Sequence, residues 1–582
     1  MYILGINAFH GDASATLIEN GEVILAIEEE RLNRIKHWAG FPYQSIHACL
    51  QQAGIGLKDL DHIAISTDPS ANLKNKIIYS LSRVTRIHSM LRDKLSKVGN
   101  IRDLRSILSE RFNVAEEEIT AGIHNVEHHL AHMASSFYVS PYEEAAIMSL
   151  DGMGDFVSSK WGVGTGTDIT TYGQVEYPHS LGYLYSAITQ YLGFRDYGDE
   201  EKVMGLASYG DPAPWQDVFN DIIKLPVDDQ SIGFKLNLDY FLHHKQGVKM
   251  QWKEGIPHVG LLYSDKLPQE LGAPRKAEDP YDQRFCNIAA SLQQRIEEVG
   301  LSMMQRLADQ TGHHTLCLAG GVVLNSVMNG KIRDRTSFEK VYIHPNAGDG
   351  GTSLGSAYYV WHQLKNNKRQ TVISHPYLGT SFDDAYIGRI LKDREQARRV
   401  ESEEELLEKT AHALAEGRVI GWFQGAMEWG PRALGARSIL VDPRRADMKD
   451  VLNHRVKRRE SFRPFAPSVL EEYVGEYFEQ DWPSPVMLMV YKVREEMRQT
   501  IPAVTHIDGT GRLQTVSREH HQRYYDLIKY FFNITGVPVL LNTSFNENEP
   551  IVHTPEEALD CFDRTRMDLL VMGNYMLWKE AP

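Results

Sequence analysis

Basic side chains gather between Gly430 and Arg463, where they could hold a compact anion. This segment carries ten Arg or Lys residues against four Asp or Glu, whereas the whole chain of 582 residues has a formal net charge of -15. The guanidinium of Arg and the ammonium of Lys suit the oxygens of phosphate and carboxylate. The sequence therefore predicts a site for a phosphate or a nucleotide in this segment.

The cations of this segment fall into two sets. The first set stands within or beside the motifs GPRALGARS and FRPFAP, where Gly, Pro and Phe make rigid turns that fix the direction of a side chain. We expect this set to form the pocket, and it consists of Arg432, Arg437, Lys457 and Arg463. The second set fits an exposed helix face, and it consists of Arg444, Arg445, Lys449 and Arg455.

Two histidines and two carboxylates could bind one metal ion. His128 and His132 are four residues apart, so a helix would place them on one face. Asp151 ends an apolar strand and Asp349 lies in a glycine-rich loop, two common ways to present a carboxylate to a metal. This mixed nitrogen and oxygen set suits Fe(II), Mn or Zn better than Ca. Two reserve ligands, whose alternative roles are a local hydrogen bond and a turn, are His129 and Asp155.

Two glycine-rich loops could let backbone amides approach a phosphate or an adenosine, because glycine has no Cβ in the way. They have the sequences GGVVLN and AGDGGTSLG. The residues expected to contact the nucleotide there are Gly320, Gly321, Asn325 and Gly350. His10, in the loop after the first apolar strand, could act as a general base because the imidazole pKa is near neutral. A purely local hydrogen bond is the alternative role for His10.

The pattern of apolar residues predicts the elements that position these groups. Strands are expected at 2–6, 15–18 and 22–27, with Asn20-Gly21 as the hairpin turn between the last two. A similar unit recurs at 145–164, where a strand, the loop DGMGD and a second extended run follow one another. Two such units predict an internally duplicated α/β nucleotide-binding fold. Residues 363–400 are expected to be a linker to a second α/β unit.

Composition narrows the class of protein. The four cysteines show no CxxC pair and no regular spacing, so we expect free thiols and neither a disulfide framework nor a thiolate zinc site. No run approaches the roughly 18 apolar residues of a membrane helix, and the start of the chain has no signal-peptide pattern. The acidic balance argues against a long nucleic-acid surface. We therefore expect a soluble cytoplasmic protein that binds small anions, without nucleic acid or membrane as partners.

Many of these motifs, in the same order, make the chain resemble the NodU/CmcH family of carbamoyltransferases, which includes tobramycin, cephem and nodulation-factor O-carbamoyltransferases. The likeness extends over nearly the whole chain. It rests on GINAFHGDAS, EERLNRIKH, EHHLAH, LDGMGD, SLGYLYSAIT, KVMGLASYG, LAGGVVLN, GDGGTSLG, GPRALGARSIL, FRPFAP, HIDGTGRLQTV and LNTSFN.

The resemblance implies a fold and a reaction. It implies an ASKHA-type (actin and sugar-kinase-like) domain over 1–365, followed by a YrdC-like α/β domain over 366–582. The second domain would form carbamoyladenylate from carbamoyl phosphate and ATP, with Mg2+ accompanying the ATP. The first would transfer the carbamoyl group to a hydroxyl of a small, secondary-metabolite-type acceptor and release AMP. A homodimer is compatible with the family.

The resemblance also implies roles for particular residues. His128, His132, Asp151 and Asp349 match the metal positions, with Fe2+ as the expected ion, and His10 matches the proposed base. The residues expected to hold carbamoyl phosphate and ATP are Arg432, Lys457, Arg463, Arg512, Asn542 and Ser544.

Other functions fit the sequence less well. A threonylcarbamoyl-type tRNA-modification protein is the main alternative, and the acidic balance opposes it. A hydrogenase-maturation carbamoyltransferase would carry CxxC zinc-finger modules, which this sequence lacks. A non-catalytic sugar-kinase-like regulator would not need the motifs around Arg432 and Lys457. The sequence does not identify the acceptor, and we expect residues 36–45 and 211–280 to select it.

Overall fold

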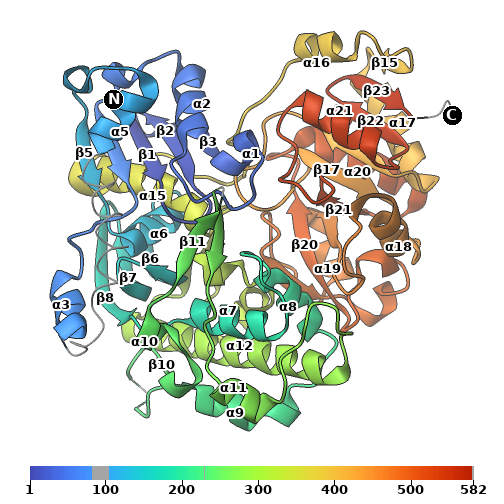
Figure 1. Cartoon of the computed structure of the whole chain (residues 1–582). Helices are drawn as coiled ribbons and strands as arrows, with labels where there is room; N and C mark the ends of the chain where they lie inside the picture. Colours follow the sequence, from blue (N-terminus) through green and yellow to red (C-terminus); the bar gives the residue numbers. More distant parts are fainter. Residues whose placement is uncertain (82–103, 229, 254, 580–582) are drawn as a thin grey trace. The chain divides into compact units, whose positions relative to one another are not determined.

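A computed structural model describes residues 1–81, 104–228, 230–253 and 255–579 (Figure 1). The chain divides into two compact units. The first comprises Met1–Val203, Gly210–Leu324 and Ile332–Ile373, and the second comprises Met204–Tyr209, Asn325–Lys331 and Ser374–Pro582. Both units are of mixed α/β type, and each is described by itself below.

The first unit contains two five-stranded sheets with the same topology. The first sheet has the order β3-β2-β1-β4-β5, and the second has the order β14-β13-β6-β7-β8. In each, three consecutive strands form an antiparallel meander, and two later strands add in parallel beside the first strand of that meander. The predicted internal duplication is therefore confirmed. The strands are β1 Tyr2–Asn7, β2 Ser14–Glu19, β3 Glu22–Glu28, β4 His62–Ile65, β5 Gly122–Asn125, β6 Glu144–Gly154, β7 Val157–Thr165, β8 Asp168–Glu176, β13 Thr315–Ala319 and β14 Lys340–Ile343.

The hairpins at the two ends of the duplication differ from each other. Asn20 and Gly21 turn the β2–β3 hairpin with φ values of 51° and 91°, as the Asn-Gly signal predicts. The expected loop DGMGD is wrong for its first four residues, because β6 continues to Gly154. A register shift between Leu150 and Gly154 lets the strand continue, and the turn lies at Asp155 and Phe156.

Two helices cross between the sheets. Helix α6 (His128–Phe137) follows the last strand of the first sheet but packs on β6 and β13 of the second. Helix α15 (Thr352–Tyr359) follows the last strand of the second sheet but packs on β1, β2 and β4 of the first. The two helices also pack on each other, and a Cβ on Gly355 of α15 would lie 1.9 Å from the carbonyl oxygen of Ala131 in α6. Glycine at this position permits the close approach.

A long helix and several short elements complete the first unit. Helix α12 runs over Gln283–Thr311 and buries one apolar face along its length. The segment 211–280, expected to be irregular, contains only short elements, including α9 (Gln216–Ile222) and the hairpin of β11 (Met250–Lys253) with β12 (Ile256–Val259).

The second unit is built on a nine-stranded mixed sheet with the order β15-β23-β22-β16-β17-β21-β18-β20-β19. Its strands are β15 Ala397–Arg399, β16 Ile420–Phe423, β17 Arg437–Val441, β18 Ala466–Leu470, β19 Met489–Lys492, β20 Thr510–Val516, β21 Val539–Ser544, β22 Leu569–Met572 and β23 Tyr575–Trp578. Helix α20 (Gln522–Thr535) packs on α17 (Glu403–Ala415), and α21 (Pro555–Arg564) packs on β16 and β22.

The expected linker at 363–400 is wrong for its second half. That half contains α16 (Asp384–Leu391) and the edge strand β15, which pairs with β23. The four cysteines are buried free thiols, as predicted. Among the residues described, no helix is long and apolar enough to cross a membrane.

Candidate active site

The four predicted metal ligands meet in the first unit. One potential ligand atom from each of His128, His132, Asp151 and Asp349 lies within 4.8 Å of the others. The Nε2 atoms of the two histidines are 3.1 Å apart, and both rings are fully buried. Nε2 of His128 lies 3.4 Å from a carboxylate oxygen of Asp151, and Nε2 of His132 lies 3.5 Å from one of Asp349. Two imidazoles and two carboxylates thus converge on one point, as a divalent cation requires.

The elements of the duplicated fold explain why these side chains converge. The histidines occupy successive turns of α6, with His128 at its first residue. Asp151 lies on β6, and its Oδ1 accepts a hydrogen bond of 2.8 Å from the backbone N–H of Gly321, which leaves Oδ2 toward His128. Asp349 begins the short turn Asp349–Gly351 that leads into α15.

Charges within the cluster shift its pKa values in opposite directions. Burial lowers the pKa of His128, but the hydrogen bond to Asp151 and the charge of Asp349 outweigh burial and raise this pKa to about 9. Burial raises the pKa of Asp151, but the neighbouring imidazoles outweigh it and hold this pKa well below its usual range. Burial and the charge of Asp151 raise the pKa of Asp349. A bound cation would relieve the repulsion between the two carboxylates.

The two reserve ligands have other partners. His129 is buried, with Nδ1 2.9 Å from the hydroxyl of Ser149 and Nε2 2.8 Å from the carbonyl oxygen of Val157. Asp155 accepts hydrogen bonds from the backbone N–H groups of Asp68 and His128, at 2.8 and 3.0 Å. The alternative role of His129, a local hydrogen bond, is therefore confirmed, and it ties α6 to the sheet. Asp155 lies at the turn after β6, but its carboxylate stabilises the start of α6 rather than that turn.

Gly154 is a residue of this site that sequence reasoning missed. A Cβ on Gly154 would lie 2.0 Å from Cδ2 and 2.1 Å from Cγ of His128. Only glycine leaves room for the ring of this ligand. The second glycine of LDGMGD was the available signal, although the sequence alone did not show which side chain it faces.

His10 and the residues predicted from the glycine-rich loops make different contacts. The rings of His10 and His128 are 5.1 Å apart between centroids. Gly320, with a φ of 105°, leaves no room for a Cβ against the carbonyl oxygen of Leu150. The backbone N–H of Gly321 donates a hydrogen bond to Asp151. The carbonyl oxygen of Gly350 accepts a hydrogen bond from Ser14, and the side chain of Asn325 caps a following helix. A nucleotide contact at these loops stays a prediction.

In the second unit, a buried polar network connects the neighbouring strands β21, β18 and β20 of the nine-stranded sheet. Nδ2 of Asn542 on β21 donates to the carbonyl oxygen of Ala433, the hydroxyl of Ser468 and Oε1 of Gln514, at 3.2, 3.0 and 3.1 Å. Nε2 of Gln514 donates to the carbonyl oxygen of Leu434 at 2.7 Å. These bonds fix the GPRALG loop over the sheet.

The predicted anion-binding residues stand around this network. Arg432 directly precedes Ala433 in the fixed loop, and Arg512 lies two residues before Gln514 on β20, hence on the same face of the strand. Ser544 lies two residues after Asn542 on β21, on the same face. Arg463 is instead placed 3.9 Å from Glu460, on the adjoining loop.

Lys457 is buried and holds the LNTSFN motif. Its Nζ lies 2.5 to 3.1 Å from four acceptors, which are the carbonyl oxygens and side-chain oxygens of Ser544 and Asn546. An ammonium has three donors, so these contacts can engage all of them. Lys457 therefore ties the basic segment to the LNTSFN motif, and an anion that binds it must share or displace these acceptors.

Arg437 differs from the expectation that it faces the anion pocket. It is fully buried, and its guanidinium donates to the carbonyl oxygens of Gln424, Gly425, Ala436 and Thr380. Burial lowers its pKa to about 10. The turn does fix the direction of this side chain, but toward backbone carbonyls inside the unit.

Glu428 is a second residue that sequence reasoning missed. It is buried, and its Oε1 accepts backbone hydrogen bonds from Leu434, Ala436 and Arg437 at 2.7, 2.7 and 3.1 Å. One carboxylate oxygen thus shapes the loop that carries Arg432. Its place just before GPRALG was a signal, but an acidic residue gave no reason to look for an anion site.

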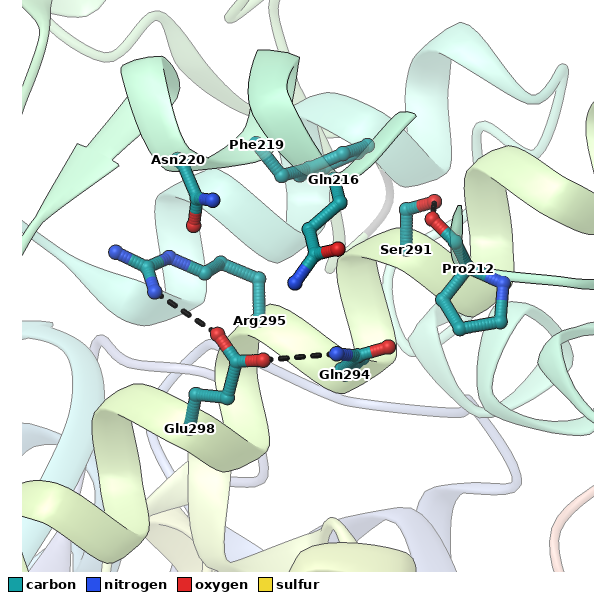
Figure 2. Close-up of a pocket in the computed structure, with 8 residues that line it drawn as sticks. All are labelled: Pro212, Gln216, Phe219, Asn220, Ser291, Gln294, Arg295 and Glu298. Carbon is teal, nitrogen blue, oxygen red and sulfur yellow. Dashed lines mark hydrogen bonds and ion pairs between the residues drawn. The ribbon is translucent and has the colours of Figure 1, made fainter. Parts of the chain in front are cut away.

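A shallow hollow on the first unit lies between α9 and α12 (Figure 2). Glu298 there pairs with Arg295 at 2.9 Å and accepts a hydrogen bond from Gln294 at 2.8 Å. None of the predicted site residues lines this hollow. It therefore adds nothing to the site.

The chain belongs to the carbamoyltransferase family. Residues 2–358 match the family model described as carbamoyltransferase N-terminus, and residues 411–579 match carbamoyltransferase C-terminus. The protein is therefore a carbamoyltransferase, a transferase enzyme, as the motifs predicted.

Several relatives support this assignment. The chain is 39% identical to nodulation protein NolNO of Sinorhizobium fredii over 99% of this chain and 80% of that protein. It is 37% identical to nodulation protein NolO of Bradyrhizobium diazoefficiens over 78% of this chain and 79% of that protein. A protein of Synechocystis sp. is 40% identical over 100% of this chain and 97% of its own. Among solved structures, HypF of T. kodakarensis matches with a TM-score of 0.31 and 14% identity over 63% of this chain and 47% of that one.

Proposed function

We propose that the protein forms carbamoyladenylate in its second unit and transfers the carbamoyl group to a hydroxyl of a small molecule at the His/Asp cluster of its first unit. The observation that carries this proposal is that each unit holds its own buried polar constellation, one rich in metal ligands and one beside cationic motifs. We further propose that the N-terminal part, 1–365, is an ASKHA-type domain and that 366–582 is a YrdC-like domain.

Adenylation brings together two polyanions, ATP and carbamoyl phosphate, so it needs fixed cations. Arg432 and Arg512, on a loop and a strand tied together through Asn542 and Gln514, fit this task. In the reaction, water attacks the phosphorus of carbamoyl phosphate and the bond from that phosphorus to the carbamoyl oxygen breaks, which releases inorganic phosphate and carbamate. A carbamate oxygen then forms a bond to the α-phosphorus of ATP, and pyrophosphate leaves. Mg2+ would accompany the ATP.

Transfer needs a proton acceptor and a means to stabilise the departing phosphate. The hydroxyl oxygen of the acceptor forms a bond to the carbamoyl carbon, the bond from that carbon to the phosphate oxygen breaks, and AMP leaves with the electron pair. His10, whose ring lies beside His128, would take the hydroxyl proton. His128, His132, Asp151 and Asp349 would hold a divalent ion, Fe2+ in our proposal, and this ion would supply positive charge near the adenylate.

The acidic charge of the chain indicates the class of acceptor. The net charge of -15 opposes a tRNA acceptor, whose phosphates need many cations. We therefore propose a small hydroxyl-bearing acceptor, and threonylcarbamoyl-type tRNA modification remains the alternative that tRNA binding would support.

The first half-reaction can be tested without the acceptor. The measurement is exchange of labelled pyrophosphate into ATP that depends on carbamoyl phosphate. We expect exchange in the wild type, a loss of at least about tenfold in Arg432→Ala because a charge-assisted contact disappears, and no loss in Arg445→Ala, which removes an exposed guanidinium paired with Asp447. Exchange that proceeds without carbamoyl phosphate, or that is absent from the wild type with both substrates bound, would refute the proposal.

A further inference from the structure

Asp12 and His37 form a hydrogen-bonded pair in the first unit that the proposed function does not use. Oδ1 of Asp12 lies 2.7 Å from Nδ1 of His37, although the residues are 25 apart in the sequence. Asp12 follows His10 by two residues in the β1–β2 loop, and His37 ends the motif EERLNRIKH, to which no role has been assigned. About a third of each side chain is exposed. Among the residues that the structure describes, Nε2 of His37 makes no hydrogen bond.

The backbone on both sides of the pair is held in register. The N–H of Phe9 donates to the carbonyl oxygen of Gly40 at 3.2 Å, and the N–H of Ala13 donates to that of Trp38 at 2.8 Å. These two bonds bracket the pair, so the loop with Asp12 and the segment with His37 move as one piece.

Both residues adopt an uncommon backbone conformation. Asp12 and His37 each have a φ of 54°, in the left-handed region that L-residues rarely occupy. The backbone N–H of His37 donates to Oε2 of Glu30 at 2.7 Å, which fixes this conformation. Strained residues held by their surroundings are concentrated at functional sites.

A chain of polar contacts connects the pair to the loop that carries Asp349. Oε1 of Glu30 lies 2.7 Å from the guanidinium of Arg31, which in turn lies 3.7 Å from Oε2 of Glu28. Oε1 of Glu28 accepts a hydrogen bond of 2.9 Å from the amide of Asn346, three residues before Asp349. This series of contacts thus links the backbone of His37 to the loop that contains Asp349.

The space at Nε2 of His37 depends on a glycine. A Cβ on Gly198, which has a φ of 90°, would lie 2.4 Å from Nε2. The ring of Tyr197 meets the imidazole edge-on at 5.3 Å between centroids. The charged and titratable groups that face His37 are Asp12, Glu30, Lys36, Tyr197 and Glu200.

Asp12, Glu30 and His37 are also close enough to bind a metal, within 4.8 Å of one another. Their potential ligand atoms are already used: Nδ1 of His37 bonds to Asp12, and the two oxygens of Glu30 contact Arg31 and the N–H of His37. The side chains of Asp12, Glu30 and His37 thus have polar partners without a cation. We therefore interpret His37 as an imidazole oriented by Asp12 rather than as a metal ligand.

We propose that His37, oriented by Asp12, donates a hydrogen bond from Nε2 to the phosphate of the adenylate and keeps it as that phosphate leaves as AMP. This rests on the transfer step of the proposed function, in which the phosphate gains charge when its bond to the carbamoyl carbon breaks. An imidazolium donor would bind the leaving phosphate more tightly than the adenylate and so favour the transition state.

The electrostatics of the pair support a donor over a base. Burial lowers the pKa of His37, but the charge of Asp12, its hydrogen bond and the charge of Glu30 outweigh burial and raise this pKa to about 9. At neutral pH the ring is therefore an imidazolium, with a proton on Nε2 to donate. The carboxylate of Asp12 fixes the ring orientation, as in other Asp-His pairs.

The test measures equilibrium binding of AMP and of adenosine to the full-length protein at pH 7.5. Asn tolerates the left-handed conformation, so His37→Asn removes the imidazole while keeping the backbone. We expect His37→Asn to weaken AMP about tenfold or more, as loss of a charge-assisted hydrogen bond implies, with adenosine unchanged. The matched control is His47→Asn, which removes an exposed imidazole on α2 (Tyr43–Ala53).

A pH series separates the contact from a packing effect. The phosphate of AMP keeps a constant charge above about pH 7, so loss of AMP affinity in the wild type near pH 9 would report His37. Asp12→Asn removes the charge that raises this pKa, so the loss should move to lower pH by at least about one unit. Equal AMP affinity in wild type and His37→Asn at every pH, or no AMP binding by the wild type, overturns the proposal. Pyrophosphate exchange should be unchanged in His37→Asn, and its absence from the wild type would instead refute the adenylating half-reaction.

Discussion

Gly154→Ala should disable the metal cluster without changing any ligand. The new Cβ would lie 2.0, 2.1 and 2.6 Å from three atoms of His128, which is fully buried and cannot turn toward solvent. The ring must therefore shift, and with it Nε2, which lies 3.1 Å from Nε2 of His132. Gly152→Ala is a matched control on the same strand, because a Cβ there meets nothing within 4 Å.

The size of the effect can be worked out in two parts. Overpacking a buried site costs about 1–3 kcal/mol of stability. A disturbed ligand should weaken metal binding about 10–100-fold, the range found when the groups that orient ligands are lost. At a metal concentration of 100 times the wild-type Kd, stabilisation by the ion would then fall from about 2.7 to between about 1.4 and 0.4 kcal/mol.

Mn2+ is a suitable probe, because it suits the same ligand set and resists oxidation in air. Isothermal titration gives its Kd for the wild type, Gly152→Ala and Gly154→Ala, and thermal melts with and without Mn2+ give the stabilisation. We expect the control to match the wild type in both. If Gly154→Ala binds Mn2+ as tightly as Gly152→Ala, the packing argument is wrong. If the wild type binds none of Mn2+, Fe2+ and Zn2+, the metal site itself is refuted.

Three further changes test other parts of the structure. Burial raises the pKa of Glu28 to about 7, so the folded state holds this proton more tightly than the unfolded state does. The stability that this group contributes therefore falls as pH rises from about 4.5 to 7. Glu28→Gln should remove this loss, which thermal melts at pH 5 and pH 8 would measure. His129→Asn should lower the free energy of unfolding by about 1–3 kcal/mol, since it leaves Ser149 or Val157 without its hydrogen-bond partner. The affinity for Mn2+ should stay within about twofold of the wild type. A large loss of Mn2+ affinity would show instead that His129 is a metal ligand. Glu428→Gln should lower the melting temperature and pyrophosphate exchange together, because it removes the charge beside Arg437 and loosens the GPRALG loop; exchange at wild-type rate would separate that loop from the reaction.

The sequence could predict those parts of the fold that depend on local chemistry. Asn20-Gly21 identified a hairpin because both residues favour positive φ. The recurrence of a strand-loop-strand unit was enough to predict the duplication, and the i, i+4 spacing placed His128 and His132 on one helix face. Each of these signals is complete within a few neighbouring residues.

Contacts between distant segments could not be predicted in the same way. Helical spacing favoured His128 over His129 as a ligand, but it could not show that Ser149 and Val157 already engage the ring of His129. Likewise, Arg437 and Arg432 stand in one motif, but only the fold shows that Arg437 is fully buried against backbone carbonyls. When a side chain has several suitable partners, tertiary packing decides which partner it contacts. The pattern of a single sequence does not contain that information.

The duplication itself explains why chemistry accumulates on one side of the first unit. Asp12 lies in the first hairpin loop of one sheet, and Asp151 and Asp155 lie at the corresponding hairpin of the other. His128 begins the helix after the last strand of the first sheet, and Asp349 precedes the helix after the last strand of the second. Because those two helices cross to the opposite sheets, each copy contributes side chains to the cluster, and neither copy could build it alone. The equivalent hairpin loops have diverged in sequence: one carries His10 and Asp12, to which we propose proton and phosphate chemistry, and the other carries Asp151, a proposed metal ligand, and Asp155, which accepts a hydrogen bond from the start of α6. Gly355→Ala would push α15 away from Ala131 and so loosen the α6–α15 crossing. It should therefore weaken both metal binding and the His37-dependent binding of AMP. A change in either hairpin loop should instead affect one of these two far more than the other.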